Sequence, residues 1–532
     1  MNCPNCNQAV TGEAAACPSC GQDLNPVVDA TQPAPESHRN RPGWLVFGVA
    51  AAVVLGLGVA AFALLGGDDP AGARLADRFP ADAIMYMEVD LEVLGSREFR
   101  SVVEAFQPLA ELAGEEELDV DLIMEEMMGA VDESLAEVDL TYADDIEPWA
   151  SGAVAFAMFG EPMEEQAAFV AEGEDSAAID TMLAKLATHA VDTYTVDGSD
   201  FLGMDDFYLG RVGEDLVGAT TTDLIEALVD GSAETLADVA TFQRQVSAVP
   251  DGGLLVFAVD NEAALAGADM ASMATEVLPG MPTPTGWTAF RLGVDDGNIR
   301  IDFAATLPEG FEFTGGDEAI LDVVPADTIA FLRIGSFFQQ YRSLAESEMV
   351  EGMEDMYGIS LEQIFSMFAR DGAIAVWPSS DPVLPVNAML AGLGDGDQSA
   401  AVDAIADFAA SMGGTISETG WGYLIENLVG FGARGDLAVL STQTELVEGP
   451  PADSFAGSDL YREATGLVEG DLQLALDVAG VIDLVDGLIA MSGDPETAEA
   501  VGCLPFGVAA SGVEVDGADV SSTFVLEIEP HC

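Results

Sequence analysis

The spacing of hydrophobic positions divides the chain into three regions. Residues 1–43 are mostly polar, whereas residues 44–65 form one apolar run without a charged residue. From residue 76 onward, short apolar runs typical of β-strands are interspersed with longer runs of helical spacing. The pattern predicts a small N-terminal module, one long apolar helix and a large folded region of strands and helices.

The large region contains two copies of one unit, because four of its segments recur in the same order. The matched pairs are 79–84 with 324–329, 149–155 with 369–375, 176–180 with 399–403, and the Asp-Gly turns at 296–297 and 516–517. Copy one is longer near its start, and the acidic segment 114–138 is the expected insert. Its apolar positions suit a half-buried helix, for which core packing is favoured over a methionine-rich binding groove.

Strand pairs joined by short turns predict a largely antiparallel sheet with helices on one face, which is an α+β fold class. We expect two tandem copies of this arrangement, at residues 76–310 and 317–532. Residues 66–75 and 311–316 have the composition of connecting segments.

The large region also resembles a known family. A Pro-Ala-Asp motif opens each copy ahead of an apolar strand, and segments 241–244 and 249–251 lead into a strand at 253–259. With the closing hairpin, these features make residues 75–530 similar to an uncharacterised bacterial family, domain of unknown function 3352. The resemblance implies an architecture and no catalytic residues.

The charge of the chain is strongly unbalanced. There are 94 acidic residues against 16 basic ones, which gives a formal net charge of -78. Nucleic acid is therefore not an expected partner, because binding to phosphates requires basic patches. The acidic residues are spread along the large region, which favours a solvated surface adapted to salt over a cation-binding site.

Four cysteines near the N-terminus form two Cys-x2-Cys pairs, and they are Cys3, Cys6, Cys17 and Cys20. Four thiolates at this spacing predict a closed, structural zinc site, which would fold a unit that is too small for its own core. Residues 1–24 resemble the short zinc ribbons at the N-terminus of many bacterial membrane proteins. We interpret the ribbon as a docking module for a cytoplasmic protein. Two disulfides or a redox motif are the alternatives.

The apolar run at 44–65 follows a proline-rich linker at 25–43 and is long enough to cross a bilayer. Arginines precede it and aspartates follow it, so the positive-inside rule places the N-terminus in the cytoplasm. We therefore predict a single-pass cell-membrane protein with an extracytoplasmic C-terminal domain that contacts the lipid bilayer through one helix. A cleavable signal peptide and a buried core helix are the competing interpretations.

Recognisable catalytic chemistry is sparse in the sequence. The histidines are His38 in the linker, His189 in the large region and His531, the penultimate residue, and this scarcity disfavours a serine–histidine–acid triad. Acidic loops at 172–175 and 395–397 precede two matched helices. They resemble calcium ligands, but capping of the helix N-termini is the favoured interpretation.

These observations favour a non-enzymatic binding or interaction scaffold with an unknown extracytoplasmic partner. A carboxylate-dependent extracytoplasmic hydrolase and a transmembrane signalling protein are the alternatives. The remaining cysteines, Cys503 and Cys532, flank the terminal hairpin. Residues facing each other across an antiparallel hairpin have a constant index sum, so we expect Cys503 to lie about two residues short of a position opposite Cys532, from which a disulfide is attainable. A buried free thiol with an exposed terminal one is the alternative.

Overall fold

The computed structural model describes residues 73–91, 100, 132, 135–136, 138–160, 166–204, 207–231, 234–250, 253–266, 284–308, 316–334, 361–380, 385–426, 428–482, 484–485 and 505–528. All of them belong to one compact unit, Gly48–Cys532.

The first half of this unit, called copy one below, contains ten strands and four α-helices among its described residues. The strands are β1 (Ala83–Asp90), β2 (Ala150–Phe159), β3 (Gln166–Gly173), β4 (Asp192–Val196), β5 (Ser199–Met204), β6 (Phe207–Val212), β7 (Asp215–Ala219), β8 (Leu255–Asp260), β9 (Thr285–Asp295) and β10 (Asn298–Thr306). The helices are α6 (Ser176–Leu186), α7 (Thr222–Val229), α8 (Ala240–Ala248) and α9 (Asn261–Ala266), with short helical turns η2 (Arg74–Arg78), η3 (Tyr142–Ile146) and η4 (Leu236–Asp238).

The second half, copy two, repeats this series. Its strands are β11 (Ala330–Arg333), β12 (Asp371–Pro378), β13 (Val386–Leu393), β14 (Ile416–Glu418), β15 (Tyr423–Ile425), β16 (Val429–Arg434), β17 (Leu437–Ser441), β18 (Asp471–Asp477), β19 (Phe506–Asp516) and β20 (Asp519–Ile528). Its helices are α13 (Leu361–Phe365), α14 (Ser399–Ser411), α15 (Glu445–Glu448) and α16 (Asp459–Leu467), with η5 (Glu318–Ile320), η6 (Ser366–Phe368) and η7 (Phe455–Gly457).

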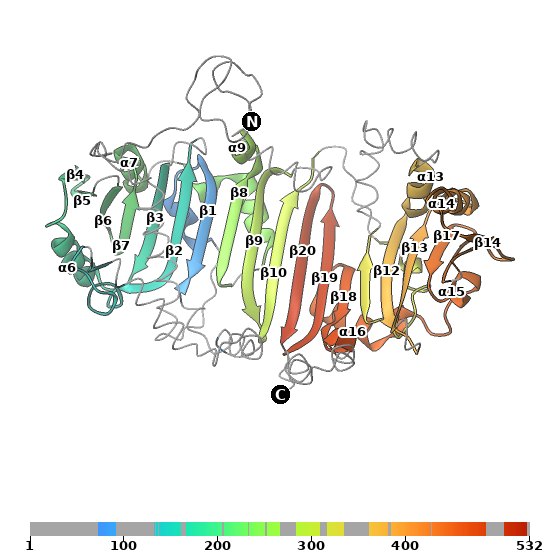
Figure 1. Ribbon diagram of the computed structural model, residues 1–532. Coiled ribbons are helices and arrows are strands. Elements are labelled where there is room, and N and C mark those ends of the chain that lie inside the picture. Colours follow the sequence, from blue (N-terminus) through green and yellow to red (C-terminus); the bar gives the residue numbers. More distant parts are fainter. Residues whose placement is uncertain are drawn as a thin grey trace, which may run out of the picture. The chain divides into compact units, whose positions relative to one another are not determined.

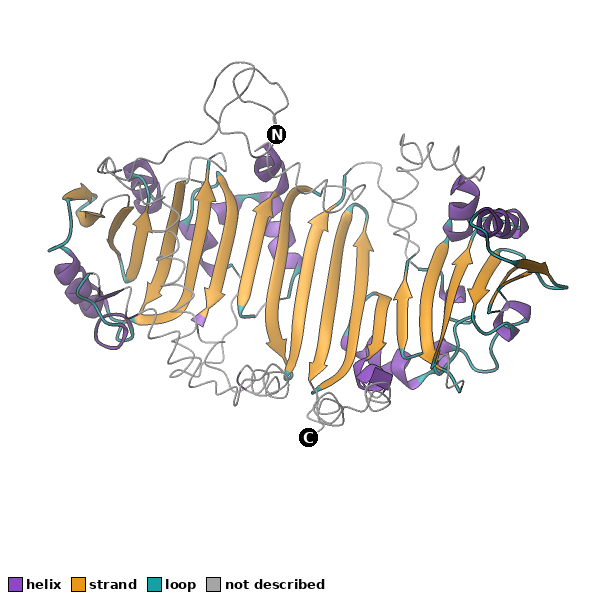
Figure 2. Cartoon of the chain, in the orientation of Figure 1, coloured by secondary structure: helices purple, strands orange, loops and turns teal. Residues whose placement is uncertain are grey.

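All the described strands pair in one antiparallel 20-stranded sheet (Figures 1 and 2). From one edge to the other the order is β4-β5-β6-β7-β3-β2-β1-β8-β9-β10-β20-β19-β18-β11-β12-β13-β17-β16-β15-β14. Each strand of copy one has its counterpart at the mirrored place in copy two. The order is therefore that of two equal units related by a pseudo-twofold axis between β10 and β20.

The predicted fold class, α+β with two tandem sheets behind a membrane helix and a zinc ribbon, was wrong. The two copies do not form separate sheets, because β10 and β20 pair along their whole length, from Ile299 opposite Leu526 to Thr306 opposite Asp519. Each copy alone would expose the last strand of its hairpin as an unpaired edge. Pairing the two edges satisfies the backbone groups of both, and one continuous sheet results.

The membrane and zinc parts of the prediction are corrected as well. Residues 1–24, 25–43 and 44–65 lie outside the described residues. In the described part of the chain, no helix has the length and apolar character needed to cross a membrane. No group of three or more histidine, cysteine or acidic side chains there is placed to hold a metal ion. The described region is held by strand pairing and side-chain packing, and it supports neither assignment.

The matched sequence segments occupy equivalent places in the two copies. Pro80 forms an isolated bridge with Thr235, and Pro325 forms the same bridge with Ser454. The predicted match of the closing turns, however, was wrong by one residue. The turn of copy one is Asp296-Gly297, closed by the pair Asp295 and Asn298, whereas that of copy two is Gly517-Ala518, closed by Asp516 and Asp519.

The larger buried cluster of each copy lies on one side of the sheet, called the helix face below. In copy one, Phe242 of α8 packs edge-on against Trp287 of β9, with ring centroids 5.0 Å apart. In copy two, Leu460 and Ala464 of α16 belong to the same buried cluster as Ala510 of β19. Small alanines on the strands of this face leave room for the helices and for large aromatic rings.

Candidate functional site

Among the residue pairs that join β10 to β20, one pair occupies equivalent positions in the two copies. Asp302 and Thr523 stand at the same distance along the chain from the turns of their hairpins, and they pair directly across β10 and β20. The hydroxyl of Thr523 donates a hydrogen bond to Asp302 Oδ1 at 2.7 Å. Asp302 therefore marks the pseudo-twofold axis, and the sites around it are built from both copies.

Asp302 is the centre of a buried ionic network on the helix face. Its side chain is 2% exposed, and Arg291, which is 6% exposed, donates a hydrogen bond to it at 2.9 Å. Arg300 Nε donates to both carboxylate oxygens at 3.0 Å. Burial alone would lower the pKa of Arg300, but the hydrogen bond and charge of Asp302 raise it above its ordinary value. Arg300 therefore stays charged, and the network fixes the junction.

The network borders a small polar cavity of about 50 Å³. The counterparts of Arg291 and Arg300 in copy two are the small residues Gly512 and Ser521, and both line this cavity. A wider cleft of about 740 Å³ lies nearby, where Arg244 and Gln245 of α8 face an acidic rim. The rim consists of Asp471, Glu514, Asp516 and Asp519.

The polar groups at the bottom of this cleft are already engaged within the protein. Gln245 Nε2 donates to the hydroxyl of Thr306 at 2.7 Å, and that hydroxyl donates to Asp519 at 2.5 Å. Arg244 lies 3.8 Å from the same Asp519 carboxylate. The cleft therefore joins the two copies through polar contacts between α8 and β20.

On the side of the sheet opposite the helix face, the junction strands present apolar side chains instead of charged ones. Phe257, Phe290 and Phe303 stand opposite one another on β8, β9 and β10, with ring centroids 6.3 and 5.0 Å apart. A second row on the same side begins at Ile301, two residues before Phe303 on β10. It continues into copy two through direct pairs and consists of Ile301, Phe524, Ser511, Leu474, Leu332 and Ile374. We call these nine residues, together with Met87 opposite Phe257, the apolar face.

The apolar face is accessible to solvent. Phe290, Ile301 and Ile374 are each 39% exposed, and Leu332 is 43% exposed. Nine neighbouring strands lead across the sheet from β1 through β10 and β20 to β12. Among their described residues, the one charged side chain whose pairing places it on this side is Asp471, at the first position of β18. The charged residues of the central strands, such as Arg291, Arg300 and Asp302, alternate with the apolar residues and so point to the helix face.

Helices cover the same side of the sheet at its two ends. In copy one, Ile179 and Met182 of α6 form a buried cluster, and Phe156 and Phe169 pack against it. In copy two, Val402 and Ala406 of α14 do the same, and Leu390 packs against that cluster.

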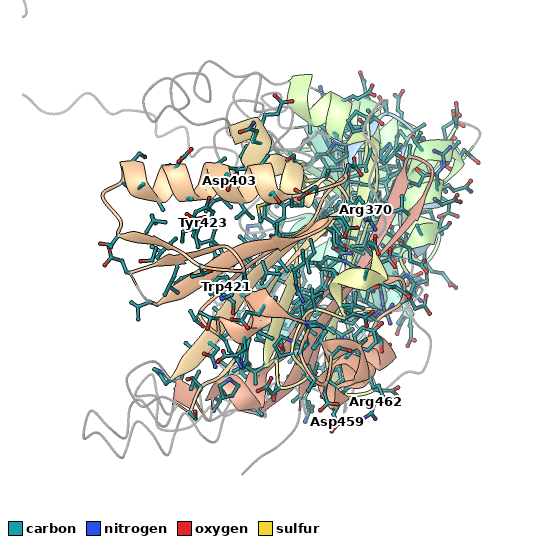
Figure 3. The ribbon with its side chains drawn as sticks, turned by 90° about the vertical axis from the view of Figure 1, so that its right-hand side faces the viewer. Arg370, Asp403, Trp421, Tyr423, Asp459 and Arg462 are labelled. Carbon is teal, nitrogen blue, oxygen red and sulfur yellow. The ribbon has the colours of Figure 1, made fainter. Side chains whose placement is uncertain are left out.

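Figure 3 shows this second end. Asp403 on α14 points toward Tyr423 on β15, whose hydroxyl donates to it at 2.7 Å, while Trp421 lies on the far side of the strands. The apolar face is thus the stretch between two helix-covered ends.

A second polar cluster lies at the start of copy one. The Arg74 guanidinium is 3.6 Å from Asp90 and 3.5 Å from Glu172, and it is 3.9 Å from Glu88. Glu88 also accepts hydrogen bonds from the Tyr86 hydroxyl and the Leu75 backbone N–H. Burial, reinforced by the Glu88 charge, raises the pKa of Tyr86 well above its ordinary value. These contacts hold η2 against β1, which is a structural role.

The cysteine sites predicted from the sequence fall on residues that the structure does not describe. The proposed zinc ligands Cys3, Cys6, Cys17 and Cys20 lie outside the described residues, as do Cys503 and Cys532, whose disulfide stays a prediction. Most of the expected insert at 114–138 is also outside.

The helix-capping interpretation is confirmed for the first acidic loop, where Asp175 is the N-cap of α6, whereas the N-cap of α14 is Gln398, whose side chain forms no cap. Asp175 accepts hydrogen bonds from the backbone N–H groups of Ala177 and Ala178, and Asp397 accepts one from Ser399. The hydrogen bonds from the Ser399 side chain and backbone lower the pKa of Asp397. These carboxylates stabilise the starts of α6 and α14.

Comparison with known proteins adds little to the geometry. No family model matches the chain, and no curated protein matches it. Among solved structures, three crystal forms of the protein TP0453 are similar to it. Form I has a TM-score of 0.25 and 10% sequence identity, and covers 46% of this chain and 82% of that one. Form III has a TM-score of 0.25 and 9% sequence identity, and form IV has a TM-score of 0.23 and 10% sequence identity. A likeness at this level identifies no relative.

Proposed function

We propose that the protein is a binding protein without catalysis of its own, and that the apolar face is its binding surface. The observation that carries this proposal is the exposure of Phe290, Ile301 and Leu332 in a stretch of sheet whose one charged side chain among the described strand residues is Asp471. The hydrolase and signalling alternatives stay predictions, since no contact described above supports either.

The energetic argument concerns the cost of leaving such a surface in water. Burying a large aliphatic or aromatic side chain completely stabilises a protein by roughly 1.5–3 kcal/mol. Scattered exposed apolar residues are ordinary, but a contiguous exposed apolar patch is typical of an interaction site. The apolar face is contiguous because its members pair directly across neighbouring strands. A partner that covers it would therefore gain the apolar burial that folding leaves unused.

Binding of the uncharged dye Nile red to the full chain tests the proposal. We expect its fluorescence to rise with the wild-type protein and to fall strongly with the double variant Ile301→Thr, Leu332→Thr. Threonine keeps the β-strand preference at both positions while removing apolar surface. The matched control is Met412→Thr, Leu428→Thr, because Met412 and Leu428 are 63% and 56% exposed and lie outside the apolar face.

Equal loss in the two double variants would contradict the proposal, since the dye would then report exposed apolar residues in general. Absence of dye binding to the folded wild-type chain would contradict it as well. Circular dichroism and the denaturant midpoint of each variant establish that the fold is intact.

A further inference from the structure

We infer that the occupant of the apolar face is the long hydrocarbon chain of an uncharged lipid, bound as a single molecule across the strands. This inference rests on the proposed function and adds the chemistry of the ligand.

The shape of the surface is the first argument. The paired rows run perpendicular to the strands, from Met87 on β1 to Ile374 on β12. At about 4.8 Å between neighbouring strands, this stretch is roughly 40 Å long. The clusters around α6 and α14 limit it at its two ends. A long apolar track with closed ends fits an extended hydrocarbon chain.

The scarcity of free hydrogen-bonding groups is the second argument. The polar side chains that pairing places within the track are the hydroxyls of Ser511 and Ser522 and, at the end of the phenylalanine row, the carboxylate of Asp471, which accepts a hydrogen bond from the Gly316 backbone N–H at 3.1 Å. The backbone groups of the central strands are engaged on both sides, because β10 pairs with β9 and with β20. A polypeptide strand could not add to this sheet here, and its own polar groups would lose water without a replacement. A hydrocarbon chain has no such groups.

The charge of the chain is the third argument. With a net charge of -78, two copies brought face to face would repel each other, and an anionic ligand would be repelled too. An uncharged lipid is not subject to that repulsion. Among partners that are apolar along their length, charge therefore favours the uncharged lipid over a second copy of this chain.

The test compares monopalmitoylglycerol with monohexanoylglycerol, each below its aggregation concentration, in displacement of Nile red from the full chain. We expect the long-chain compound to displace the dye and the short-chain one to be at least about tenfold weaker, because each added CH2 contributes about 0.8 kcal/mol when buried. The variant Phe290→Thr, Ile301→Thr should weaken the long-chain compound by about tenfold or more. The control Met412→Thr, Leu428→Thr should leave it unchanged.

The outcomes separate this inference from the proposed function. Dye binding that depends on Ile301 but resists displacement by monopalmitoylglycerol would overturn the lipid inference alone. A doubling of mass in sedimentation, abolished by Ile301→Lys, would identify a second copy as the occupant and also overturn it. No dye binding by the folded chain would indicate a segment of the chain itself on this face, and would overturn both.

Discussion

Asp302 and Thr523 are equivalent residues of the two copies, and they face each other across the axis that relates those copies. A residue on such an axis meets its own counterpart, so identical copies would place two equal charges in contact. Copy one has the aspartate and both arginines that bind it, whereas copy two has a threonine whose hydroxyl completes the set. The junction is therefore asymmetric in chemistry although its strand order is symmetric.

The Thr523 hydroxyl should contribute measurably to stability. In the variant Thr523→Val, which has nearly the same shape, the donor to Asp302 is lost, and we expect the free energy of unfolding to fall by about 1.5–3 kcal/mol. Urea denaturation followed by fluorescence measures the change. Thr523→Ser keeps the hydroxyl and should lose less. If Thr523→Val is as stable as wild type, the hydrogen bond at the axis has no net effect.

Removal of the Asp302 carboxylate should be the most costly change at the junction. The variant Asp302→Ala leaves Arg291, whose side chain is 6% exposed, as a buried charge without its partner. We expect a loss of about 3–5 kcal/mol in the free energy of unfolding. The control is Asp459→Ala, because Asp459 and its partner Arg462 are 91% and 68% exposed and an exposed ion pair contributes little. Similar losses in both variants would contradict this account.

The sequence predicted the repeat because its matched segments surround turns and helix starts, where residue identity is restricted by backbone geometry. The Pro80 and Pro325 bridges and the starts of α6 and α14 are such places. The joining of the copies was not predictable in the same way. Whether β10 pairs with β20 or remains an edge depends on contacts between residues more than two hundred positions apart, and no local pattern encodes it.

The apolar face was missed for a different reason. In β9 and β10 the charged residues Arg291, Arg300 and Asp302 alternate with apolar ones, and such a pattern ordinarily indicates that the charged side faces water. Here the charged side is buried under helices, because the three residues neutralise one another. No local signal distinguishes the two cases, because an apolar series on the other parity, with Phe290, Ile301 and Phe303, is also what a strand with one solvated face contains.

A pH dependence is expected at Asp371, whose side chain is 2% exposed beside Arg333. Burial raises the pKa of Asp371 above its ordinary value of 3.8, and the nearby Arg333 charge only partly opposes this shift. In the window just above 3.8, the folded state therefore binds more protons at this site than the unfolded state does. The contribution of Asp371 to stability is accordingly present below that window and is lost as the pH rises through it.

The measurement for Asp371 is the free energy of unfolding of wild type minus that of Asp371→Asn, determined from pH 3 upward. Asparagine does not titrate, so the difference isolates this one carboxyl. We expect the difference to decrease as the pH rises. An increase with pH would mean that the ion pair with Arg333 outweighs burial and lowers the pKa of Asp371.

The hairpin turn of copy one allows a test of backbone conformation in which side-chain packing does not change. Gly297 has a φ of +83°, and a Cβ added there would meet no other atom within 4 Å. Because an L-residue in the left-handed region costs roughly 1–2 kcal/mol, we expect Gly297→Ala to lower the free energy of unfolding by about 1 kcal/mol or more. Gly449→Ala is the matched control, since that site is equally open but extended, with a φ of -158°. There the substitution only restricts the unfolded chain, so stability should stay the same or rise slightly. Equal effects at Gly297 and Gly449 would exclude the positive φ as the reason for glycine in the turn.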